Sequence, residues 1–249
     1  MLNRLKELKE KKAVHIAIIC FIIILAITIA GIIMLKYYVE GEKSLPFQLS
    51  KIIVVSSASG TNIEDPNAKW NLQVDQNNDI YISIQKNLEH QSSEVIKSIK
   101  IDNITVSKND ETIGETKIYR PAAEGLYKKE DQYIIQNSVE YQGNKESNLG
   151  DLKIANQGGN ILFRVSNQNV ATYQTNDEQI NHDGTLLAKS NITKEQIKSN
   201  LSFDIIIETG RGIKYKGTVS FELPVGDILT EGTSTIEKTD FSDIIFKRI

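Results

Sequence analysis

Residues 201–223 read LSFDIIIETGRGIKYKGTVSFEL, and their pattern is the clearest indication of the fold class. Apolar side chains occupy every second position from Phe203 to Ile207, and a similar alternation runs from Ile213 to Leu223. Such a period of two is typical of strands that bury one face. The intervening Thr-Gly-Arg-Gly favours a turn. The stretch therefore predicts an antiparallel hairpin with strands over residues 201–208 and 213–223.

The same alternation extends through the rest of residues 46–249. It predicts further strands over residues 51–56, 70–74, 80–84, 99–106, 117–120, 133–141, 151–155 and 161–166. Asp75 to Asp79, which read Asp-Gln-Asn-Asn-Asp, are interpreted as a hairpin turn, and Gly158-Gly159 as another. The apolar parity changes between Ile101 and Ile104, which indicates a bulge near Asp102-Asn103.

One short helix interrupts this pattern. Thr193 and Gln196 have the spacing of a capping box, so one or two helical turns are expected up to Asn200. About ten strands with frequent turns are typical of all-β proteins. We therefore expect residues 46–249 to form an antiparallel, jelly-roll-like β-sandwich. Two smaller sandwiches divided near residues 121–132 are the alternative.

Residues 13–35 contain no Asp, Glu, Lys or Arg, which predicts a transmembrane helix. The 23 residues would extend about 34 Å at 1.5 Å per residue, enough to cross a hydrocarbon core of about 30 Å. A cleaved signal peptide is the competing interpretation, with a weak cleavage site at Thr28-Ile29-Ala30. The apolar run continues past this site to Leu35, which favours a retained helix.

The distribution of charge predicts the orientation of this helix. Residues 1–12 carry five basic and two acidic side chains, whereas the part after residue 35 carries 24 basic and 30 acidic ones. The positive-inside rule therefore assigns residues 1–12 to a cytoplasmic basic tail. Residues 36–45 would be a short stalk, and residues 46–249 an extracytoplasmic domain at the cell membrane. The acidic balance of that domain argues against nucleic acid as a partner.

Cys20 is the only cysteine in the sequence and lies within the predicted span. The exported part must therefore fold without disulfides, which is more typical of bacterial envelopes than of animal extracellular modules. The abundance of Ile, Lys and Asn also favours a bacterial source. We expect no cofactor.

Two candidate metal sites are weak. His90 and His182 could contribute to a zinc site, but a polar loop around His90 and a turn at His182-Asp183-Gly184 explain them better. Asp75, Asn77 and Asp79 have the spacing that opens a calcium-binding loop, but Ile80 and Lys86 occupy positions that need Gly and Glu. The hairpin-turn interpretation is favoured, and no metal-binding residue is assigned.

No catalytic residue is assigned either. The sequence has no Gly-x-Ser-x-Gly, Walker, dinucleotide-binding or His-Glu-x-x-His motif. Glu140, Glu208 and Glu222 lie in predicted strands, but their pattern does not identify a hydrolytic pair. The aromatic residues that could bind a sugar are scattered, and Trp70 has core parity; the tyrosines are Tyr81, Tyr119, Tyr127 and Tyr173.

These observations favour a non-enzymatic binding or assembly protein of the cell envelope, held in the bilayer by residues 13–35. An envelope protein or a glycan would be its partner. A glycan hydrolase or carbohydrate-binding protein is the first alternative. A signalling role is the second alternative. Because a cytoplasmic tail of 12 residues is too short for a folded output domain, the protein would then need a partner and act as a subunit of a membrane signalling complex.

Overall fold

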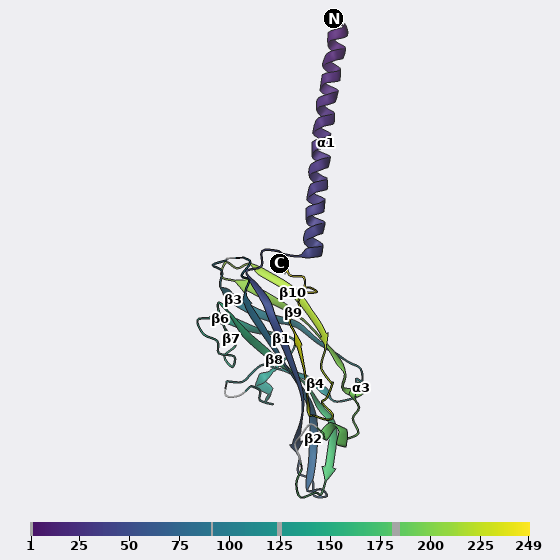
Figure 1. Ribbon diagram of the computed structural model, residues 1–249, viewed down its shortest axis with the longest axis vertical. Helices are drawn as coiled ribbons and strands as arrows, with labels where there is room; N and C mark the ends of the chain where they lie inside the picture. Colours follow the sequence, from purple (N-terminus) through teal and green to yellow (C-terminus); the bar gives the residue numbers. More distant parts are fainter. Residues whose placement is uncertain (1, 91, 124–125, 181–184) are drawn as a thin grey trace. The chain divides into compact units, whose positions relative to one another are not determined.

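A computed structural model describes residues 2–90, 92–123, 126–180 and 185–249 (Figure 1). The chain divides into two compact units, Met1–Lys43 and Ser44–Ile249. The first unit contains helix α1, Leu2–Glu40, and the second contains the sheets. The all-β fold class with one N-terminal apolar helix is confirmed.

Helix α1 is long and apolar enough to cross a membrane, and the described residues contain one helix of this kind. Its large apolar side chains between Val14 and Leu35 are exposed, as expected of a helix whose solvent is lipid rather than water. The helix continues beyond the predicted span to Glu40, so the first half of the predicted stalk is helical.

The second unit consists of two six-stranded sheets. The order in sheet A is β11 (Thr233–Lys238), β1 (Phe47–Asn62), β2 (Trp70–Lys86), β8 (Gly158–Thr175), β4 (Glu115–Tyr119) and β5 (Ile134–Ile135). The order in sheet B is β12 (Lys247–Arg248), β10 (Lys214–Glu222), β9 (Ser199–Thr209), β3 (Ile96–Lys108), β6 (Val139–Asn144) and β7 (Lys153–Ala155). The described strand pairs are antiparallel except for β6 with β7.

The main core lies between the two sheets. The predicted hairpin is confirmed as β9 and β10, in which Phe203 opposes Val219, and both side chains are buried. Phe203 also meets Phe163 of sheet A edge-to-face, with ring centroids 5.4 Å apart. The Tyr141 hydroxyl of sheet B donates a 2.5 Å hydrogen bond to the Leu162 carbonyl of sheet A. These contacts join the sheets into one sandwich.

A second, smaller apolar cluster lies where β1, β2 and β8 extend past the main core. Helices α2, Leu186–Lys189, and α3, Lys194–Ile197, cover it. The predicted capping box of α3 is confirmed, because the Thr193 backbone N–H donates to Gln196 Oε1 at 3.0 Å. Another short helix, η1, spans Asp131–Tyr133.

The structure confirms one predicted irregularity and corrects another. The register of β3 with β9 shifts between Asp102 and Thr105, and Asn103 has a φ of 52°, as expected of a bulge. Gly158 and Gly159, in contrast, do not form a hairpin turn. They begin β8 and pair with β2, whereas the preceding β7 belongs to sheet B. This connection therefore crosses from one sheet to the other.

The predicted hairpin turn at Asp75–Asp79 is also wrong. These residues lie in the middle of β2, which is one continuous strand of 17 residues. Asp75, Gln76, Asn77 and Asn78 are all buried. Neighbouring groups supply most of the hydrogen bonds of these polar side chains, which makes their burial tolerable, and Asn78 Oδ1 is a buried acceptor without a hydrogen bond. The residues between Tyr133 and Tyr141 differ too, since they form the separate strands β5 and β6 rather than one strand.

Candidate functional site

The clearest concentration of buried polar groups lies along the centre of β2. Alternation along the strand directs Asp75, Asn77 and Asp79 to the outer face of sheet A, opposite to the core-facing Ile80 and Ile82. We call these three residues the polar row. Part of a connecting segment, residues 126–133, contacts Asp75 of this row and the Arg164 side chain that binds Asp79, and we call this segment the strap.

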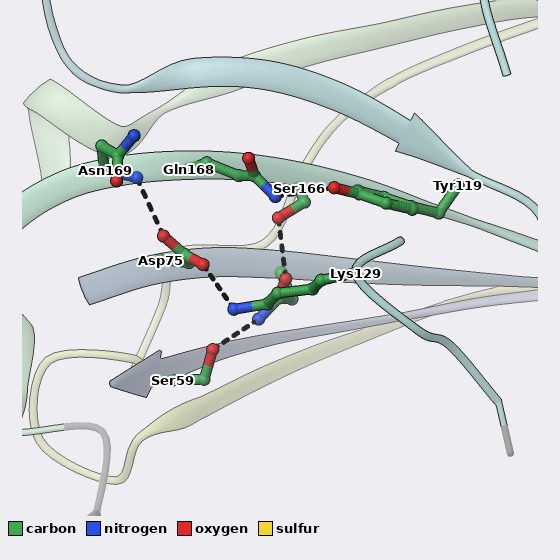
Figure 2. A network of polar contacts seen from close by, with 8 residues as sticks. Ser59, Asp75, Tyr119, Lys129, Ser166, Gln168 and Asn169 are labelled. Atoms are coloured by element: carbon green, nitrogen blue, oxygen red, sulfur yellow. Dashed lines mark hydrogen bonds and ion pairs between the residues drawn. The ribbon is translucent and has the colours of Figure 1, made fainter. Parts of the chain in front are cut away.

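Asp75 joins the strap to a distortion of the sheet. Its Oδ2 atom lies 2.5 Å from Lys129 Nζ of the strap, and its Oδ1 accepts a 2.8 Å hydrogen bond from the Asn169 backbone N–H (Figure 2). Asn169 has a φ of 57° in an irregular part of the β2–β8 pairing. Asp75 therefore satisfies a backbone donor that the ladder leaves free, and Lys129 neutralises its charge.

Asn77 connects three neighbouring strands. Its Nδ2 donates to Ser59 Oγ of β1 at 2.9 Å, and its Oδ1 accepts from Ser166 Oγ of β8 at 2.8 Å. Figure 2 shows a further contact on β8, in which Gln168 Nε2 donates to the Tyr119 hydroxyl of β4 at 2.7 Å. Hydrogen bonds between side chains thus continue across four strands of sheet A.

Asp79 forms the strongest ion pair of the row. Arg164 of β8 binds it through two nitrogens, with Nε at 2.5 Å and Nη2 at 2.9 Å. The Arg164 guanidinium also lies 4.2 Å from the centre of the Tyr127 ring, which belongs to the strap. Burial, together with the negative charge of Asp79, raises the pKa of Tyr127. The phenol therefore stays neutral at physiological pH.

Two residues of the same stretch face the interior instead. Gln76 donates to Ser56 Oγ at 3.4 Å, and Asn78 Nδ2 donates to the Val165 carbonyl at 3.3 Å. The first apolar cluster includes Ile80, and the second includes Val74, so these amides lie on β2 between the two clusters. A polar layer thus separates the apolar clusters along this strand.

The calcium hypothesis does not fit this geometry. Side chains at positions 75, 77 and 79 of one extended strand are about 7 Å apart along it, too far to converge on an ion with ligands at about 2.4 Å. The oxygens of Asp75 and Asp79 already accept hydrogen bonds from a lysine, an arginine and a backbone N–H. The described residues contain no group of three or more His, Cys, Asp or Glu suited to a metal ion.

The two histidines give no support for zinc. His90 lies in the loop after β2, and its backbone N–H bonds to the Asn87 carbonyl at 3.2 Å. His182 and its predicted turn lie outside the described residues.

Glu208 and Glu222 are too far apart to form a hydrolytic pair. Glu208 opposes Lys214 at one end of the β9–β10 hairpin, and Glu222 opposes Asn200 at the other. These positions are eight residues apart along β10, about 27 Å, whereas hydrolytic pairs lie within about 10 Å. Lys97 hydrogen-bonds to Glu208 at 2.6 Å and lowers its pKa. Glu140 opposes Lys100 on β3.

The aromatic residues do not form a flat exposed platform. Tyr119 is buried, and the Tyr127 hydroxyl is buried as well. Tyr173 packs against the second apolar cluster, and Tyr81 is half-buried on the outer face of sheet A. Trp70 is partly exposed, and its Nε1 donates to the Asp177 carbonyl at 3.2 Å.

A second polar cluster surrounds Asp204 on sheet B. Asn103 and Thr218 each donate to it at 2.6 Å, and Lys216 lies 2.8 Å away. Burial opposes ionisation of Asp204, but the bonds from Lys216, Thr218 and Asn103 outweigh it and lower its pKa. The cluster ties the bulge at Asn103 to β9 and β10, which is a structural role.

Sequence reasoning missed Lys129 and Arg164, which are far from the polar row in the chain, and considered Tyr127 only as a sugar-binding residue. One signal could have identified the row itself. The apolar residues on both sides of the row all have even numbers: Leu72, Val74, Ile80, Ile82 and Ile84. One continuous strand keeps such residues on the same face, whereas two strands joined by a turn need not share the same parity.

No family model, curated protein or solved structure matches the chain.

Proposed function

We propose that this protein is a single-pass membrane protein whose β-sandwich binds or assembles with a partner outside the cytoplasm. The observation that carries the proposal is the division of the chain into an apolar helix of membrane-spanning length and a separate compact β unit. The residues of both apolar clusters of the β unit lie between residues 45 and 246. The sandwich therefore has a core of its own, and the helix is free to serve as an anchor.

The chemistry of the sandwich supports binding rather than catalysis. Three largely buried aspartates each form an ion pair: Asp75 with Lys129, Asp79 with Arg164, and Asp204 with Lys216. Catalytic acids and bases usually have perturbed pKa values and are accessible to a substrate. Groups that are locked in ion pairs instead stiffen a scaffold, and a stiff scaffold presents a defined surface to a partner. An envelope protein or a glycan is the proposed class of partner.

The proposed orientation places residues 1–12 in the cytoplasm and residues 36–249 outside, at a bacterial cell envelope. It follows from the excess of basic residues before the helix. Protease added to intact cells, or to protoplasts where a wall blocks access, should digest the sandwich and leave an N-terminal fragment. Protection of the sandwich in intact cells, with digestion after lysis, would contradict the orientation.

A helix exchange tests the anchor role. Residues 13–35 carry mainly Ile, Leu and Ala on every side, and no buried charge that could relay a proton. An unrelated apolar span of equal length should therefore support normal function, whereas a secreted form without the helix should not. If the exchanged protein reaches the membrane at normal levels but fails, the helix recognises a partner. The protein would then be a subunit of a membrane complex.

A further inference from the structure

One end of the β-sandwich is basic and carries an exposed leucine. It contains the start of β1, Lys86 at the end of β2 with the described loop residues 87–90 and 92–94, the turn 209–214 between β9 and β10, and strand β12. Leu88 in the loop is 85 % exposed. The three later segments carry five basic side chains against two acidic ones, Glu89 and Glu94; the basic residues are Lys86, Arg211, Lys214, Lys247 and Arg248.

Backbone contacts bring these segments together within the sandwich. The Asn87 N–H donates to the Pro46 carbonyl at 3.0 Å, and the Gly210 N–H donates to the Val95 carbonyl at 2.8 Å. Strand β12 pairs with β10 immediately after the turn, at Tyr215 and Lys216. The basic residues therefore belong to one end of the sandwich, which we call the basic end.

The opposite end has the opposite charge. It consists of the β1–β2 connection and the segments beside the second apolar cluster, residues 62–69, 176–180, 185–198 and 222–232. These residues carry eight acidic and four basic side chains. The sandwich is therefore polarised along its strands, and the polarity decides which end an anionic surface attracts.

We propose that the basic end docks on the headgroups of an anionic lipid bilayer, with Leu88 inserted at the interface. The inference rests on the proposed function, because it takes α1 as the membrane anchor. Residues 41–46 connect α1 to β1 and limit the distance from Glu40 to Phe47 to about 25 Å at most. The basic end, where β1 begins, is thus the end that the short connection holds near the lipid.

The chemistry of this end fits a lipid surface better than a protein groove. Arg211 and Lys214 have side chains that are 74 % and 50 % exposed, so they can reach phosphate groups while keeping contacts to Glu94 and Glu208. Each basic residue near an anionic membrane contributes about 1 kcal/mol, or about fivefold in the ratio of docked to undocked domain. A single exposed apolar side chain adds to this attraction without making the contact irreversible.

The test uses the full-length protein reconstituted in vesicles, with Cys20→Ser removing the native thiol. An environment-sensitive fluorophore is attached at Leu88→Cys or, as a matched control, at Ile63→Cys, an exposed apolar position of the acidic end that is 46 % exposed. The vesicles contain phosphatidylcholine alone or mixed with phosphatidylglycerol, and a lipid spin-labelled at its headgroup quenches the fluorophore. Arg211→Gln/Lys214→Gln is compared with Lys69→Gln/Lys189→Gln, which removes two charges from the acidic end.

Docking predicts strong quenching at position 88 and weak quenching at position 63 in the mixed vesicles. Quenching at 88 should fall in neutral vesicles, at high salt and in Arg211→Gln/Lys214→Gln, but not in Lys69→Gln/Lys189→Gln. Equal quenching at position 88 in both lipids and in both charge variants would overturn the proposal. It would mean that the short connection to α1, and not the charge of the basic end, keeps position 88 near the headgroups. Flotation separates the two inferences: protein that does not float with vesicles refutes the anchor, whereas floating protein with unquenched position 88 refutes docking only.

Discussion

Replacing Arg164 with Ala should destabilise the sandwich by about 3 kcal/mol, the low end of the range for breaking a buried ion pair. The substitution removes two hydrogen bonds to Asp79 and the contact with the Tyr127 ring. The Asp79 side chain is only 14 % exposed, so water compensates its unpaired charge poorly. Replacing Asp79 with Ala should cost a similar amount, because it leaves the guanidinium unpaired.

The double variant distinguishes an interacting pair from two independent losses. Because each single substitution already removes the pair, the two together should also cost about 3 kcal/mol, which corresponds to a coupling energy of about 3 kcal/mol. Urea unfolding of residues 44–249, followed by circular dichroism and by fluorescence of the single Trp70, measures these free energies.

The matched control is another ion pair between neighbouring strands of sheet A. Lys51 and Glu237 lie 3.0 Å apart with side chains that are 41 % and 49 % exposed, so their coupling should stay below about 1 kcal/mol. If the Asp79 and Arg164 substitutions were additive, or coupled no more strongly than this surface pair, the assigned structural role of the polar row would be refuted.

Three further predictions concern the same unit. Gly143→Ala should destabilise it by about 2 kcal/mol or more, because the added Cβ would lie 2.0 Å from the Ile96 carbonyl oxygen; a wild-type urea midpoint would contradict that geometry. Phe203→Ala should cost about 3–5 kcal/mol, and Phe221→Ala should cost less because Phe221 is only partly buried; the reverse order in urea unfolding would refute the assignment of the core. The lowered pKa of Asp204 means that its ionised form contributes stability above its unfolded pKa of about 3.9, and that this contribution is lost as pH falls through the lower folded value. Unfolding measured from neutral to acidic pH should therefore show a smaller loss of stability for Asp204→Asn than for the wild type.

The sequence determined the features that depend on nearby residues. The apolar run of residues 13–35 is found within one helix because almost all of its side chains are apolar and favour the same solvent. The β9–β10 hairpin followed from alternation and a glycine-containing turn, and the bulge at Asn103 followed from a change of parity. Each of these signals lies within about 25 consecutive residues, so the relevant physics is visible in the order of side chains.

The course of the chain at Asp75–Asp79, in contrast, depends on contacts between distant parts of the sequence. Five polar residues in succession favour an exposed turn, because water and the nearby backbone can then satisfy the hydrogen bonds of their side chains. In the folded protein Lys129 and Arg164 supply ion pairs, and Ser59, Ser166 and the Asn169 backbone supply hydrogen bonds. These partners come from β1, β8 and the strap, up to 94 residues away in the chain. The same segment therefore becomes the centre of a strand, since the partners that make its burial tolerable meet only after the sheet has formed.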